Sequence, residues 1–162
     1  FQLQTDALLA QCDAHTKAIF LCSPNNPTAN DLNQDNIRTI LEQAHCLVVI
    51  DEAYIDFTDR ASWIHELDRY PNLVVLQTLS KAYGLAGLRL GMAFASPALI
   101  SWFMRVKAPY NLGKLTQQFA LDALEQHARV GSFIQTIRQE KVRLIDFLQQ
   151  NPAVTRVWPS DA

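Results

Sequence analysis

The sequence predicts an α/β protein in which a mostly parallel sheet lies between helices, a three-layer α/β/α arrangement. Apolar runs without alternation occur at residues 17–22, 46–50 and 73–76, as expected of strands buried on both faces. A segment with the apolar spacing of a helix separates the first two runs. Each run ends in a polar or turn-forming segment, so the chain alternates strands, loops and helices as α/β proteins do.

The first half of the chain supplies a helix, a strand, a second helix and a second strand. Residues 5–13 have the pattern of a short helix, and the apolar run at 17–22 follows. Asn33 is a residue type that caps helices, and Asp51 closes the run at 46–50. The second helix is predicted from four apolar residues at helical spacing: Ile37, Ile40, Leu41 and Ala44.

The second half predicts one more strand of the sheet and then mainly helices. After the run at 73–76, residues 89–95 predict a strand, and Ser96-Pro97 predicts the start of a helix that reaches about Val106. Further along lie helices near 114–128 and 132–150, the latter long and amphipathic, and a lone strand at 154–158. A lone strand belongs to a sheet completed elsewhere, and residue 1 is not Met, so we expect a piece of a longer protein.

Composition excludes several classes of function. The 162 residues are 49% hydrophobic and carry a formal charge of −2, with basic and acidic residues interspersed. No basic stripe is available for nucleic acid or for an anionic membrane, and no apolar run is long enough to span a bilayer. Three cysteines in or beside apolar stretches favour reduced thiols and a cytoplasmic protein, and the four histidines lack metal-ligand spacing.

Three polar segments follow the strands at the places where ligands bind in open α/β sheets. They are residues 25–27, 51–54 and 78–81, with Arg89 further along the chain. Each taken alone has an ordinary explanation: Asn-Asn-Pro is a common turn, a carboxylate after a strand caps or turns, and a lone Lys or Arg lies on the surface. Together they indicate a site, because their groups complement one kind of cofactor.

The combined groups suit an aldehyde cofactor with a pyridine ring, a phenolic oxygen and a phosphate. Lys81 offers the amine that bonds the aldehyde, and Asp51 is a carboxylate that keeps the pyridine nitrogen protonated. Asn26 and Tyr54 are hydrogen-bond donors for the phenolic oxygen.

The phosphate of such a cofactor needs donors of its own. Arg89, with the hydroxyls of Thr78 and Ser80, offers charge-assisted hydrogen bonds to it.

The three segments resemble the central motifs of the fold-type I pyridoxal-phosphate-dependent aminotransferases, and most strongly the histidinol-phosphate branch of that family. The resemblance rests on residues 23–28, 49–57 and 78–89, with a further match in Ala108-Pro109-Tyr110-Asn111-Leu112, and covers nearly the whole chain. It implies the cofactor pyridoxal 5'-phosphate, bound to Lys81, which also moves protons during catalysis. It also implies the cofactor contacts assigned above to Asn26, Asp51, Tyr54 and Arg89.

The resemblance further implies transfer of an amino group between histidinol phosphate and 2-oxoglutarate in histidine biosynthesis, by a homodimer. Residues 1–130 correspond to part of the cofactor-binding large domain, and 131–162 to an interdomain helix and the start of a small domain. A preceding glycine-rich turn and a following substrate-binding arginine, both typical of the family, are not in this chain, so we expect the chain by itself to be inactive.

Two alternative functions remain, and the sequence departs from the family pattern at one position. Threonine-phosphate decarboxylases of cobalamin biosynthesis share these motifs, and some transcriptional regulators carry a noncatalytic aminotransferase-like domain. The departure is Ala29, where the family usually has Gly; if the backbone needs a positive φ there, Ala adds strain of less than about 2 kcal/mol.

Overall fold

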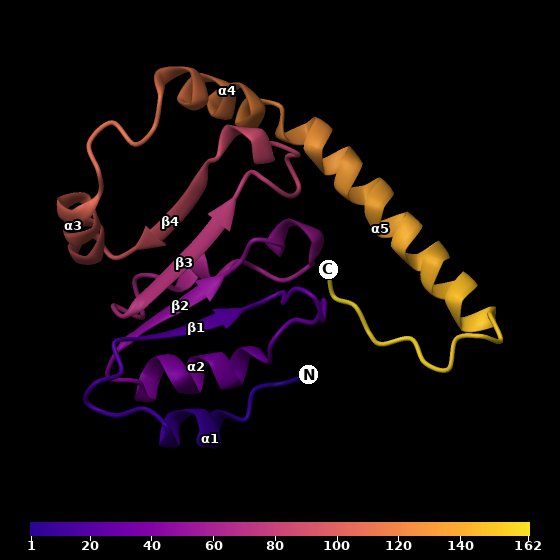
Figure 1. Ribbon diagram of the computed structural model, residues 1–162, viewed down its shortest axis with the longest axis horizontal. Helices are drawn as coiled ribbons and strands as arrows, with labels where there is room; N and C mark the ends of the chain where they lie inside the picture. Colours follow the sequence, from indigo (N-terminus) through magenta and orange to yellow (C-terminus); the bar gives the residue numbers. More distant parts are fainter.

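The computed structural model describes residues 1–162 and has a four-stranded sheet at its centre (Figure 1). Strands β1 (Ala18–Cys22), β2 (Leu47–Asp51) and β3 (Leu73–Thr78) are parallel, and β4 (Gly91–Ala95) runs antiparallel to β3. The order in the sheet is β1-β2-β3-β4. The α/β class and the mostly parallel sheet are therefore confirmed.

Helices α1 (Thr5–Ala10) and α2 (Gln34–Gln43) pack on one face of the sheet (Figure 1). The predicted cap is confirmed, because the Asn33 side chain accepts hydrogen bonds from the backbone N–H groups of Asp35 and Asn36. α1 ends at Ala10, three residues before the predicted end. The core between helix and sheet is formed by Ile19, Leu21, Ile37, Ile40, Leu41, Val48, Ile50, Trp63, Tyr70, Leu73 and Val75.

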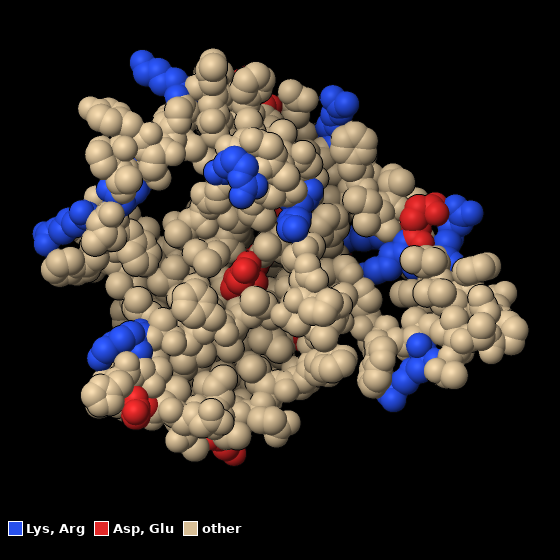
Figure 2. All heavy atoms as spheres, in the orientation of Figure 1, with Lys and Arg blue, Asp and Glu red and all other residues tan.

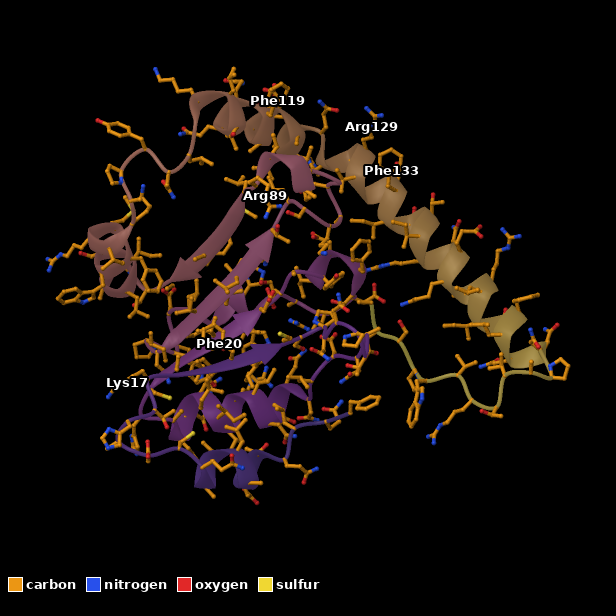
Figure 3. All side chains as sticks on the ribbon, in the orientation of Figure 1. Lys17, Phe20, Arg89, Phe119, Arg129 and Phe133 are labelled. Carbon is orange, nitrogen blue, oxygen red and sulfur yellow. The ribbon has the colours of Figure 1, made fainter.

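The opposite face of the sheet is not covered by a helix along β1. Phe20 points from this face and is 69% exposed, whereas Val49 and Val74 beside it are buried (Figure 3). A strand buried on both faces shows no such alternation, so the expected two-sided burial holds for β2 but not for β1. Along β1, therefore, only one of the two predicted helical layers is present.

The C-terminal half consists of helices α3 (Pro97–Val106), α4 (Lys114–Glu125) and α5 (His127–Gln150). Ser96 caps α3 through its side chain, with Pro97 in the first turn, as predicted. α5 begins five residues before the predicted start, and its apolar stripe remains partly open, with Ile137 and Leu144 more than half exposed. None of these helices combines the length and apolar character needed to cross a bilayer.

The predicted strand at residues 154–158 is wrong, because this segment is irregular. A strand forms only where a neighbour supplies hydrogen bonds, and no strand lies beside it. The chain instead returns toward the sheet, where the Asp161 N–H donates to the Ala29 carbonyl at 2.7 Å (Figure 1). The Asp161 carboxylate in turn accepts from the Asp31 N–H at 2.7 Å.

Candidate functional site

The predicted site residues lie along the edge at which the three parallel strands end. Cys22, Asp51 and Leu76 are register partners across β1, β2 and β3, so the segments that follow these strands emerge side by side. This placement confirms that the polar segments predicted from the sequence share the carboxyl edge of the sheet, where α/β proteins bind ligands.

Asn26, Tyr54 and Lys81 come together at this edge from three separate segments. The Asn26 amide donates a hydrogen bond to the Tyr54 hydroxyl at 3.0 Å. The Lys81 ammonium nitrogen lies 5.1 Å from the centre of the Tyr54 ring, within range of a cation–π interaction. Asn26 and Lys81 are exposed and Tyr54 is half-buried, so all three polar ends are open to a ligand.

Asp51 ends β2 and points to the face of the sheet that α2 does not cover. The Ala53 N–H donates to its carboxylate at 2.9 Å, which orients the side chain. Its register partner Cys22 lies next to it, and burial, followed by the negative charge of Asp51, raises the pKa of the Cys22 thiol. Asp51 thus presents a fixed carboxylate at the same edge of the sheet as Asn26, Tyr54 and Lys81.

Thr78 and Ser80 form a second polar group at the end of β3. The Thr78 hydroxyl lies 2.9 Å from the Ser80 hydroxyl and accepts a hydrogen bond from the Ser80 N–H at 3.1 Å. Arg89 follows the short 3₁₀ helix η3 (Ala86–Leu88) near this strand end (Figure 3). Its backbone is left-handed, with φ of 54°, and its guanidinium donates to the Ala86 carbonyl at 3.0 Å rather than to either hydroxyl.

The loop that carries Asn26 has an unusual backbone. The Ser23-Pro24 and Asn26-Pro27 peptide bonds are cis, and Ala29 has φ of 55°. The backbone at residue 29 therefore does adopt a positive φ, a conformation that favours glycine, although the residue here is alanine. The loop closes on itself through the N–H of Ala29, which donates to the Asn25 carbonyl at 2.6 Å.

Sequence reasoning missed a buried ionic cluster behind the site. Glu52 points away from Asp51, because adjacent residues of a strand face opposite sides of the sheet. Its side chain is fully buried and pairs with Arg60, which also pairs with Asp31. The sequence offered one sign of this cluster: Glu52 follows an apolar strand, and Arg60 lies eight positions later. No spacing rule, however, links the two residues.

Charges on the visible face are dispersed. Figure 2 shows Lys and Arg side chains separated around a largely uncharged surface, with no continuous field of one sign. Burial raises the pKa of Asp56, and the nearby Glu52 adds to this effect. Burial also raises the pKa of the Tyr83 hydroxyl, with a further contribution from Asp56. No group of His, Cys, Asp and Glu side chains has the arrangement of a metal site.

Comparison with known proteins identifies the family of this chain. The sequence pattern of the family described as "Aminotransferase class I and II" matches residues 1–156. This chain belongs to that family. The segments on which the sequence resemblance rests include those that the fold brings to one edge of the sheet.

One curated relative of this aminotransferase chain is the histidinol-phosphate aminotransferase of Bacteroides fragilis. It is 47% identical over all 162 residues, which amount to 47% of the relative. The chain thus spans about half the length of the curated relatives that it matches.

Two solved structures have the same fold. The histidinol-phosphate aminotransferase of Sinorhizobium meliloti, in complex with pyridoxal-5'-phosphate, superposes with a TM-score of 0.81 over 98% of this chain and 44% of its own, at 24% identity. The L-threonine-O-3-phosphate decarboxylase of Porphyromonas gingivalis gives a TM-score of 0.80 over 94% of this chain and 48% of its own, at 25% identity.

Proposed function

We propose that this chain carries the central part of the active site of a pyridoxal-phosphate-dependent aminotransferase. The observation that carries the proposal is the convergence of Asn26, Tyr54 and Lys81 at the carboxyl edge of the sheet, where β2 ends in Asp51. An amine, a fixed carboxylate and two donors to one oxygen form the donor set that this cofactor requires.

The residues present fit the cofactor. When bound, pyridoxal phosphate supplies an aldehyde and a protonated pyridine ring that withdraws electrons from the bonds of the substrate α-carbon. Asp51 holds the proton on the pyridine nitrogen, because a carboxylate at close range favours the cation. Asn26 and Tyr54 donate to the phenolic oxygen from positions that already lie 3.0 Å apart.

Lys81 has two roles in this proposal. Its amine would hold the cofactor through the aldehyde, and with substrate in the site the same amine would carry a proton to and from the substrate α-carbon. Lys81 is exposed at the edge of the sheet, next to the Tyr54 ring, so its nitrogen is accessible for both roles.

Thr78, Ser80 and Arg89 are proposed to bind the phosphate. The two hydroxyls are already paired at the end of β3, and Arg89 follows on the next loop. Because its guanidinium contacts only the Ala86 carbonyl and is exposed, it is free to make charge-assisted hydrogen bonds to an anion.

The proposed substrates are histidinol phosphate as amino donor and 2-oxoglutarate as acceptor, in histidine biosynthesis. Support comes from the 47% identity to the Bacteroides fragilis enzyme. We also propose that residues 1–130 form part of a large domain and 131–162 an interdomain helix and the start of a small domain. The complete protein is proposed to be a cytoplasmic homodimer without nucleic-acid or membrane partners.

The proposal is tested with Lys81→Ala in the complete enzyme. Turnover of histidinol phosphate should fall by at least about 100-fold, because the variant lacks both the amine and the proton carrier. Pyridoxal phosphate should remain bound but should not become attached to the protein on borohydride reduction. In the wild type, reduction should attach it to the peptide that contains Lys81. Near-normal transamination by the variant would exclude the assignment.

A second candidate is a threonine-phosphate decarboxylase, favoured by the likeness to the Porphyromonas gingivalis structure. The two candidates differ in products. Release of carbon dioxide from threonine phosphate by the complete enzyme, without glutamate formation from 2-oxoglutarate, would support the decarboxylase.

A further inference from the structure

A buried polar cluster lies on the side of the sheet opposite to Asp51. Its centre is Glu52, whose side chain is fully buried. The carboxylate accepts hydrogen bonds from Arg60 at 2.7 Å, from the Trp63 N–H at 3.0 Å and from the Gln77 amide at 3.0 Å, and it also accepts one from the Ser62 hydroxyl. Every contact of this carboxylate is a donor, so the cluster compensates the cost of its burial.

Arg60 connects this cluster to both ends of the loop that carries Asn26. Its side chain is only 9% exposed. One terminal nitrogen donates to Glu52, the other donates to the Ser23 carbonyl at 2.6 Å, and the Nε donates to the Asp31 carboxylate at 2.9 Å. Ser23 precedes the loop and Asp31 follows it, and the Ser23 hydroxyl donates to Asp31 at 2.9 Å. One guanidinium therefore holds both ends of the loop.

The same guanidinium holds the segment that carries Tyr54. Glu52 lies two residues before Tyr54, and Tyr54 is the hydrogen-bond partner of Asn26. The loop's internal bonds, such as the Asn25 N–H to the Asn30 carbonyl at 3.0 Å, fix its shape but not its place relative to Tyr54. Contacts from outside the loop set its place: the Ser23 N–H donates to the Asp51 carbonyl, Arg60 donates to Ser23 and Asp31, and Asp161 bonds Ala29 and Asp31.

We propose that Arg60 is a positioning residue that, through Glu52, Ser23 and Asp31, sets the distance between the Asn26 amide and the Tyr54 hydroxyl. The inference rests on the proposed function, because it assigns that pair to the cofactor's phenolic oxygen. Besides the carbonyl of its neighbour Ala61, the planar Arg60 guanidinium has three acceptors that lie in three directions around it. A lysine ammonium keeps the charge but cannot span the three from a single rigid plane.

The test uses the complete enzyme with pyridoxal phosphate bound and compares wild type, Arg60→Lys, Asn26→Ala and the double variant. The readout is the pH midpoint of the visible absorbance change of the holoenzyme. Loss of one donor to the phenolic oxygen should raise the midpoint in Asn26→Ala by about one pH unit. Arg60→Lys should raise the midpoint by about 0.5 pH units or more. It should also lower kcat by about 10-fold or more, because a small displacement of groups that orient the reacting atoms slows the reaction.

The double variant separates positioning from general destabilisation. If Arg60 acts through Asn26, adding Arg60→Lys to Asn26→Ala should change the midpoint little further. Additive shifts would overturn the proposal, as would a wild-type midpoint in Arg60→Lys. Arg38→Lys is the matched control, since Arg38 is also partly buried and ion-paired but lies on α2 away from the site, and it should keep the wild-type midpoint.

A second variant keeps the test decisive if Arg60→Lys does not fold. Asp31→Asn leaves the Arg60–Glu52 pair in place and weakens the two contacts of the Asp31 carboxylate, with Arg60 and with the Ser23 hydroxyl. A smaller rise of the midpoint in the same direction supports the proposal, and an unchanged midpoint overturns it. A wild-type enzyme that binds no pyridoxal phosphate would instead contradict the proposed function itself.

Discussion

At the scale of single residues, the site combines ordinary side chains with two left-handed backbone positions. Ala29 and Arg89 both have positive φ, a conformation that costs an L-residue with a Cβ about 1–2 kcal/mol. Both lie in segments of the proposed cofactor site, in the loop of Asn26 and after Lys81. Strain at such positions persists only where surrounding contacts hold the backbone in place.

Ala29→Gly is expected to leave the chain as stable as before or to stabilise it by up to about 1 kcal/mol. Glycine removes the left-handed penalty, although part of the gain is lost because the unfolded chain becomes more flexible. The free energy of unfolding from denaturant titration measures the difference. Ala98→Gly in the exposed part of α3 serves as control and should destabilise by about 1 kcal/mol. An equal decrease in the free energy of unfolding in both variants would show that Ala29 is not strained.

At the scale of elements, α5 is attached to the rest of the molecule mainly through polar contacts. Its apolar stripe is partly exposed, but Arg138 reaches the 3₁₀ helix η1 (Ile55–Phe57) that follows Tyr54. The guanidinium donates to the Phe57 carbonyl at 3.1 Å, to the Thr58 carbonyl and to the Asp59 carboxylate at 2.7 Å. Arg138 thus joins the long helix to a segment of the proposed site.

Arg138→Ala should lower the free energy of unfolding by about 1–2 kcal/mol, because carbonyl acceptors lose a charged donor. Hydrogen exchange should also become faster in residues 56–59. The matched control on the same helix is Arg143→Ala, which removes an exposed ion pair with Glu140 and should cost less than about 0.5 kcal/mol. Similar effects of the two substitutions would show that the Arg138 contacts do not attach α5.

At the scale of the whole molecule, the chain provides one wall of the proposed binding site, and the opposite side is open. The proposed residues line the carboxyl edge of the sheet, and the face that carries Asp51 also carries the exposed ring of Phe20. The chain spans about half of its curated relatives, so the remaining walls of the site are expected from sequence outside these 162 residues.

The 162-residue chain by itself is therefore expected to bind pyridoxal phosphate weakly or not at all and to show no measurable transamination. A cofactor held by these residues would meet few donors on its open side, so most of its surface would stay in water. The measurement is the visible absorbance of the chain mixed with pyridoxal phosphate, before and after dialysis. A band that survives dialysis would contradict the expectation.

The sequence by itself determined the strands of the sheet, most helices and the order of the site residues. Apolar runs and helical spacing are local signals, and the caps at Asn33 and Ser96 act within one turn. Because parallel strands end at one edge, motifs that follow them meet there, so the convergence of Asn26, Tyr54 and Lys81 followed from topology. The assigned cofactor roles of these residues stay predictions.

Only the tertiary structure decided how distant polar groups pair and which apolar segments find neighbours. Residues 154–158 have the composition of a strand but lack a strand beside them, so they remain irregular. The attachment of the Asn26 loop to Arg60 joins residues 37 positions apart, and no local pattern encodes such a distance. Burial of Glu52 likewise depends on donors from several segments that meet only after folding, because an unpaired charge is costly inside a protein.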